Sequence, residues 1–127
     1  MKVGGFDAVI GNPPYIRIQR IEYNQSDYLY KKYSTPTSKT DISIVFIEKA
    51  VSLINKTGVV GFISSSQWMA TDYGKNIRNF LSDGKIQEIV NFGSLPVFQN
   101  ASTYPAIFII SHNLTKNVRL KRINSKD

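Results

Sequence analysis

Residues 12–15, Asn-Pro-Pro-Tyr, follow an apolar segment at residues 6–10 that predicts a strand buried in a parallel sheet. Proline has no backbone N–H, so this turn presents mainly hydrogen-bond acceptors. The side-chain carbonyl of Asn12 and the main-chain carbonyl of Pro13 can converge on a group that has two hydrogens to donate. Tyr15 adds a flat face beside them. A planar ring that carries an amino group, such as adenine, fits this arrangement.

The same atoms suggest a reaction. The exocyclic nitrogen of adenine is a poor nucleophile because its lone pair is delocalised into the ring. Two acceptors outside the ring plane favour a pyramidal amine that can attack a methyl sulfonium, and only the part of each bond that strengthens in the transition state adds to the rate. The paired prolines stiffen the turn. Asn-Pro and Pro-Pro are also common turn signals, so the alternative is an ordinary turn, and the apolar strand and Gly11 before these residues favour the catalytic interpretation.

The composition narrows the class of protein. The chain has 127 residues, of which 42% are hydrophobic, so it is one domain or a piece of one. It has no cysteine and a single histidine, His112, so we expect neither disulfides nor a metal site. No signal peptide or membrane-spanning segment is present in the sequence, and we expect a cytoplasmic protein.

The charge favours a polyanionic partner. Sixteen Lys and Arg against nine Asp and Glu give a net charge of +7. Basic residues are mixed with tyrosines in the segment after the turn: Arg17, Arg20, Lys31, Lys32 and Lys39 with Tyr23, Tyr28, Tyr30 and Tyr33. Such a mixture suits phosphate contacts and base stacking. Alternatively, the tyrosines belong to a helix that lies on the core.

Hydrophobic periodicity predicts alternating strands and helices. We expect strands at residues 6–10, 58–64, 86–92 and 106–111, and helices at about residues 26–32, 42–55 and 73–81. Ser26 is expected to cap the first helix, and Gly58 to mark the break after the second. Residues 118–123 form either an added edge strand or the start of a linker. The order of elements indicates an α/β layered fold.

The loop at residues 93–105 carries apolar side chains where polar turn residues are usual, namely Leu95, Val97, Phe98 and Tyr104. Open α/β sheets bind ligands at the ends of their strands, so this loop suggests a pocket wall. The alternative is a loop that packs into the core.

Three ordered blocks resemble the amino-group-specific DNA methyltransferases, in particular the adenine enzymes of type IIG restriction-modification proteins. The blocks are FDAVIGNPPYI at residues 6–16, KTDISIVFIEKAVSLINKTGVVGFISSSQWM at 39–69 and IVNFGSLPVFQNASTYPAIFII at 89–110. Together they cover most of the chain. The resemblance implies a partial Rossmann-like fold of the S-adenosylmethionine-dependent methyltransferases. Residues 1–127 would form the C-terminal half of the sheet, as a single partial domain that ends in an antiparallel hairpin strand.

The resemblance also implies roles for individual residues in the methylation of a flipped adenine within a restriction-modification system. Asn12 and the Pro13 carbonyl would hold the amine, in a turn completed by Pro14. Tyr15 would stack on the base, and Phe98 would contact its other face. Further residues would assist: Arg17 and Lys39 at the DNA, and Asp41 and Phe46 near S-adenosylmethionine.

The sequence departs from this family in one respect. The glycine-rich turn and the acidic residue with which such enzymes bind the cofactor are not found, and no target-recognition domain follows. We therefore expect the catalytic half of a methyltransferase, whose partners are double-stranded DNA and the missing parts, in a longer parent or in trans. Alone, it should bind S-adenosylmethionine weakly and transfer no methyl group at a useful rate.

Two other functions are compatible with the sequence. NPPYI also occurs in enzymes that methylate a glutamine side-chain amide on release factors, and this amide presents the same two hydrogens. A sheet fragment that lacks the cofactor half is also consistent with a non-catalytic remnant that binds DNA or serves as a scaffold.

Overall fold

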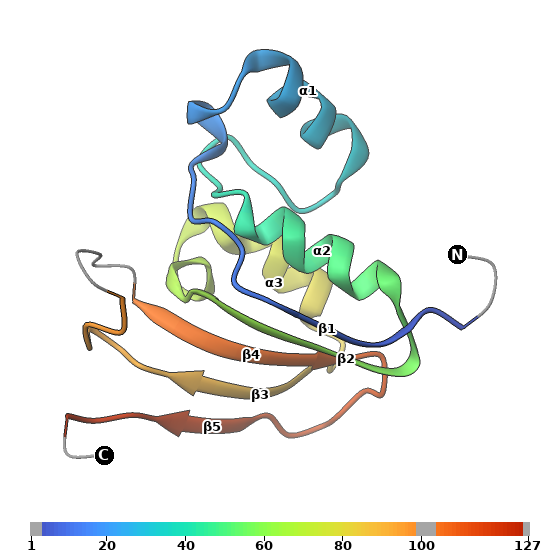
Figure 1. Cartoon of the computed structure of the whole chain (residues 1–127), viewed down its shortest axis with the longest axis vertical. Coiled ribbons are helices and arrows are strands. Elements are labelled where there is room, and N and C mark those ends of the chain that lie inside the picture. Colours follow the sequence, from blue (N-terminus) through green and yellow to red (C-terminus); the bar gives the residue numbers. More distant parts are fainter. Residues whose placement is uncertain (1–3, 99–103, 126–127) are drawn as a thin grey trace.

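The computed structural model describes residues 4–98 and 104–125, which fold into one five-stranded sheet with helices on one face (Figure 1). The strands are β1 (Phe6–Gly11), β2 (Ile54–Ser65), β3 (Ile86–Asn91), β4 (Pro105–Ser111) and β5 (Arg119–Arg122). The helices are α1 (Tyr23–Lys32), α2 (Ser43–Leu53) and α3 (Lys75–Leu81). None of the helices in these described ranges is long and apolar enough to cross a membrane. The α/β layered fold predicted from the sequence is confirmed.

The strand order in the sheet is β1-β2-β4-β3-β5. β1 is parallel to β2 and β3 is parallel to β5, whereas β4 is antiparallel to both of its neighbours. β4 is therefore the antiparallel strand that the sequence predicts. The carboxyl ends of the other four strands all lie at one end of the sheet, beside the start of β4. This end carries the loops that follow β1, β2 and β3.

The core lies between the sheet and the two helices α2 and α3. The predicted apolar face of α2 is buried here, with Ile44, Ile47 and Val51 almost fully covered. Opposite them, β2 and β4 contribute Val60, Phe62 and Phe108, and each large buried side chain stabilises the fold by about 1.5–3 kcal/mol. Phe108 also lies 4.9 Å from Trp68, measured between ring centroids.

Several boundaries differ from the prediction. α1 begins at Tyr23, and Ser26 lies inside it, where its hydroxyl donates to the Tyr23 carbonyl instead of capping the helix. β2 begins at Ile54 directly after α2, so Gly58 lies within the strand and marks no break. Gly58 is required there because an added Cβ would stand 2.6 Å from the Phe6 carbonyl oxygen. Residues 119–122 form the edge strand β5, the first of the two alternatives.

The segment between the turn and α2 is held by one carboxylate. The two oxygens of Glu48, on α2, accept hydrogen bonds from the backbone N–H and hydroxyl groups of Ser34 and Thr35, at distances of 2.5–3.0 Å. Hydrogen bonds to an ionised acceptor are stronger than those to a neutral one.

Helix α1 has no buried residue, so its tyrosines do not form part of the core.

We predict that Glu48→Gln lowers the free energy of unfolding by about 1–3 kcal/mol, because a buried donor loses its acceptor. Partial burial raises the pKa of Glu48, but the hydrogen bonds from Thr35 and Ser34 outweigh it and leave the pKa below its usual value. The stabilisation is therefore complete above the pKa in the unfolded chain, about 4.3, and is lost as the pH falls through the lower folded pKa.

Chemical denaturation of both proteins between about pH 3 and pH 7 measures this contribution. Glu22→Gln is the control, since Glu22 precedes α1 without a side-chain hydrogen bond to it. Equal losses of stability in the two variants would contradict the assignment.

Candidate functional site

The Asn-Pro-Pro-Tyr turn lies at the end of β1, at the sheet end where the loops gather. β1 pairs with β2 up to Gly11, which lies opposite Phe62. Beyond it, Pro13 is buried while Asn12 is exposed. The Asn12 side chain makes no hydrogen bond to any residue in the described ranges. Its carbonyl is therefore available to an external donor.

Two backbone hydrogen bonds attach the turn to the start of α2. Ile18 N–H donates to the Thr40 carbonyl at 2.9 Å, and Ile42 N–H donates to the Ile16 carbonyl at 2.8 Å. Between these bonds, Arg17 and Asp41 form an antiparallel bridge. We call this pairing of residues 16–18 with residues 40–42 the clasp.

The clasp brings the two predicted DNA-contacting residues together. The Arg17 guanidinium donates to the Lys39 carbonyl at 2.8 Å and lies 5.4 Å from the centre of the Tyr73 ring. Lys39 is exposed. The Arg17 guanidinium is thus partly occupied by its contacts with Lys39 and Tyr73, whereas the exposed Lys39 side chain remains accessible to solvent.

Asp41 and Tyr15 share a buried environment behind the turn. The Asp41 side chain is 8% exposed, and its Oδ1 accepts hydrogen bonds from the Ser43 N–H, at 2.9 Å, and from the Ser43 hydroxyl. Burial raises the pKa of Asp41 despite these bonds and the Arg17 charge. Burial, and then the Asp41 charge, also raise the pKa of Tyr15. The Tyr15 hydroxyl is buried without a hydrogen-bond partner among the described residues.

Tyr15 and Phe98 are in direct contact. Their ring centroids are 6.4 Å apart and their planes are inclined at 79°, an edge-to-face arrangement. A base stacked between them would need parallel rings separated by two van der Waals contacts, or about 7–8 Å. The sequence predicts that these two rings flank a base. In the structure the rings contact each other, so the slot for a base between them is closed. Of the predicted loop at 93–105, residues 99–103 lie outside the described ranges.

The described part of that loop is fixed at both ends. Ser66, after β2, donates from its backbone N–H and its hydroxyl to the Tyr104 carbonyl, at 2.9 and 2.7 Å. At the other end, Gly93 N–H donates to the Asn91 side chain at 2.8 Å. Leu95 and Phe98 are partly buried and Val97 is exposed, so residues 93–98 of the loop do not pack into the core.

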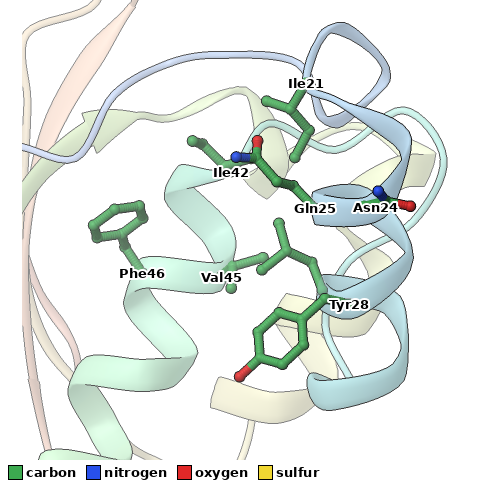
Figure 2. Close-up of a pocket in the computed structure, with 8 residues that line it drawn as sticks. Ile21, Asn24, Gln25, Tyr28, Ile42, Val45 and Phe46 are labelled. Atoms are coloured by element: carbon green, nitrogen blue, oxygen red, sulfur yellow. The ribbon is translucent and has the colours of Figure 1, made fainter.

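Phe46 lies apart from the turn, at a cavity of about 470 Å³ between α1 and α2 (Figure 2). The lining is mostly apolar and consists of Ile21, Asn24, Gln25, Tyr28, Leu29, Ile42, Val45 and Phe46. The Phe46 ring is 45% exposed. Neither Asn12, Tyr15 nor Phe98 lines this cavity. The family resemblance implies a role for Phe46, but the sequence did not predict the cavity, because α1 supplies half of its lining from side chains with no clear apolar periodicity.

The positions of Phe46 and Asp41 indicate which of the two could contact a cofactor. An exposed aromatic ring at an apolar cavity suits the flat, uncharged part of a nucleoside. The Asp41 carboxylate, in contrast, is buried and already bonded to Ser43. Of these two residues, Phe46 is therefore better placed than Asp41 to contact a cofactor directly.

Comparison with known proteins identifies the family. The model of the Eco57I restriction-modification methylases matches residues 1–98. The chain belongs to this family. It is 36% identical over 114 residues to the type II methyltransferase M.BstVI of Geobacillus stearothermophilus; the match covers 88% of this chain and 20% of that protein. The chain thus spans about a fifth of the length of this relative.

Solved structures agree on the fold. A Listeria monocytogenes protein assigned to the class I S-adenosylmethionine-dependent methyltransferases superposes with a TM-score of 0.72 at 17% identity, over 98% of this chain and 39% of that one. The type IIL restriction-modification enzyme MmeI, solved in complex with DNA, gives 0.70 at 18% identity, over 93% and 17%. The predicted partial Rossmann-like methyltransferase fold is confirmed.

We predict that Asp41→Asn leaves the start of α2 intact and increases stability at neutral pH. Asparagine keeps the oxygen that accepts from Ser43 and removes the buried charge. Because the folded pKa of Asp41 is raised, the favourable contribution of the protonated carboxyl is present below the unfolded pKa, about 3.9. It is lost as the pH rises through the folded pKa.

Denaturation curves at acidic and neutral pH test this. The gain of Asp41→Asn over the unaltered chain should appear only at the higher pH. Asp41→Ala should lose about 1–3 kcal/mol at both, since the Ser43 donors lose their acceptor. An Asp41→Asn variant that is less stable at neutral pH would show instead that the charge stabilises the site.

Proposed function

We propose that this chain is the methyl-acceptor half of a DNA adenine methyltransferase that acts at specific sites in a restriction-modification system. The observation that carries the proposal is the Asn-Pro-Pro-Tyr turn. It presents the exposed carbonyl of Asn12, which is unbonded among the described residues, next to Tyr15, whose ring is in edge-to-face contact with Phe98. Family membership supports DNA methylation, and the turn supports an exocyclic amine as the acceptor.

The turn would activate the amine by its placement. Asn12 and the Pro13 carbonyl accept the two N–H hydrogens, which holds the nitrogen lone pair away from the ring. S-adenosylmethionine, when bound, supplies a methyl group on a sulfonium sulfur. The nitrogen–carbon bond forms as the carbon–sulfur bond breaks, and one amine proton then leaves to solvent. No strong base is needed, because the methylated amine is acidic.

The aromatic residues would hold the extruded base. Flipping a base out of the duplex costs a few kcal/mol. Stacking on aromatic side chains contributes about 1–3 kcal/mol for a base, so Tyr15 and Phe98 can offset much of this cost once the slot between them opens. Lys39, and Arg17 as far as its contact with Tyr73 allows, would contact phosphates near the turn.

The cofactor-binding half would continue the sheet from β1. β1 pairs only with β2, and its other edge is open in the described structure. Ile10 is 85% exposed and Phe6 is 52% exposed, although parallel sheets are usually covered on both faces. We propose that additional strands and helices cover these residues and hold S-adenosylmethionine against Phe46. A target-recognition domain would complete the enzyme.

We predict that Asn12→Ala abolishes methyl transfer but spares DNA binding. The test uses residues 1–127 joined to the cofactor-binding half of an Eco57I-family relative. The rate should fall by about 10²-fold or more, as when a transition-state hydrogen bond is removed, while DNA affinity changes little. Asn76→Ala, at an exposed position of α3, is the control. Loss of DNA affinity without loss of the rate at saturating DNA would refute the assigned role.

Two features of the proposed reaction can be tested together: the group that accepts the methyl, and the need for the cofactor-binding half. Labelled methyl groups from S-adenosylmethionine should enter duplex DNA, and mass spectrometry of the hydrolysed DNA should show N6-methyladenine. Residues 1–127 alone should transfer almost none, and adding the cofactor-binding half should restore transfer. Label in a glutamine-bearing release factor instead of DNA would establish the protein amide methyltransferase. No transfer in any combination would favour a non-catalytic remnant.

A further inference from the structure

The edge strand β5 is a strongly basic surface that the acceptor site does not explain. Three of its four residues, Arg119, Lys121 and Arg122, are basic, and all four are exposed. Arg119 forms an ion pair with Glu88 at 3.3 Å. Lys121 and Arg122 form no ion pair with any residue in the described ranges. Two cations without an ion pair therefore occupy the last two positions of this edge strand, with side chains that leave it toward opposite faces of the sheet.

Register places these cations beside the loop that carries Phe98. Arg122 pairs with Asn91, the last residue of β3, and the next N–H along the chain, that of Ile123, donates to the Asn91 carbonyl at 2.9 Å. Asn91 also holds the start of the loop through its bond from Gly93. The end of β5 is thus fixed to the residue from which the Phe98 loop begins.

The Asn-Pro-Pro-Tyr turn, which we call the acceptor turn, lies at the same end of the sheet but at the other outer strand, β1. β1 and β5 are the two outer strands, separated by the three strands β2, β4 and β3 (Figure 1). Four inter-strand spacings of about 4.8 Å place their ends about 19 Å apart. Duplex DNA carries one negative charge per about 1.7 Å of its axis, counting both strands, so a stretch of this length carries about eleven phosphates, of which a part face the sheet.

We propose that Lys121 and Arg122 bind the phosphate backbone of DNA on the side of the acceptor site opposite Arg17 and Lys39. This inference rests on the proposed action on DNA. The end of β5 on one side, and Arg17 and Lys39 on the other, would then hold the duplex at two positions, with the Tyr15–Phe98 pair between them.

Basic residues on an edge strand have another common role, which is to prevent pairing with a second chain. Charge at any place along the strand would serve that purpose. Here the two unpaired cations are the last two residues of β5, next to the Phe98 loop, while Arg119 at its start is neutralised by Glu88. The concentration of free charge at the site end of the strand favours the phosphate contact.

The test measures DNA binding by the 127-residue chain itself. Fluorescence anisotropy with a short duplex, at several salt concentrations, compares the unaltered chain with the double variant Lys121→Gln/Arg122→Gln. The control is Lys49→Gln/Lys56→Gln, which removes the same charge, from +7 to +5, at exposed positions away from the acceptor turn. Each phosphate contact contributes about 0.9 to the slope of log affinity against log salt concentration.

We expect the β5 variant to lower that slope by about 1.8 and to weaken binding at about 0.1 M salt by tens of fold, and the control to change both much less. Equal effects of the two pairs, no effect of the β5 pair, or no binding by the unaltered chain would each overturn the proposal. Self-association of the β5 variant, seen by sedimentation with unchanged DNA affinity, would assign these residues to edge protection. Because binding is measured without methyl transfer, this result is independent of which group the enzyme methylates.

Discussion

The clasp between residues 16–18 and 40–42 is the constraint on which the rest of the site depends. Its two backbone hydrogen bonds attach the acceptor turn to the first turn of α2, whose inner face is packed on the sheet through Ile44 and Ile47. Tyr15 is therefore positioned from two directions, by β1 and by α2, and both belong to the core. The intervening segment needs no buried helix of its own, because Glu48 attaches it to α2 by a second set of bonds. A turn positioned in this way loses little additional entropy when a base binds.

The closed contact between Tyr15 and Phe98 is compatible with a binding site for a base. An aromatic pair contributes about 0.5–1.5 kcal/mol beyond the area that it buries. A base stacked on an aromatic side chain gains about 1–3 kcal/mol. Exchanging the Phe98 contact for a base is thus favourable once the base has left the duplex. Until then the two rings cover each other, and Tyr15 keeps its hydroxyl out of water.

The sequence predicted those parts of the fold whose signals are local. Apolar runs located the strands, three- and four-residue spacing located the buried face of α2, and the Asn-Pro-Pro-Tyr turn predicted the candidate site, which stays a prediction. It did not predict the role of Glu48, because its partners Ser34 and Thr35 lie 14 and 13 residues away and show no periodicity. The start of β2 was misplaced because Gly58 reads as a helix stop, while in the fold it allows a close approach to Phe6. The burial of Asp41 depends on the clasp, which is a long-range pairing.

The two outer strands of the sheet, β1 and β5, differ in the kind of partner that each could bind. Among the described residues, the outer edge of β1 is unpaired and apolar, with Ile10 and Phe6 exposed, and such an edge readily pairs with another strand unless it is covered. The edge of β5 is short and basic, a combination that discourages further strands and attracts anions. An extension of the sheet is therefore expected at β1, beside the turn that would need a methyl donor under the proposed function. Under the same proposal, the nucleic acid would reach β5, beside the loop that carries Phe98. The Asn-Pro-Pro-Tyr turn would then lie between these two surfaces, where a base from one could meet a methyl group from the other.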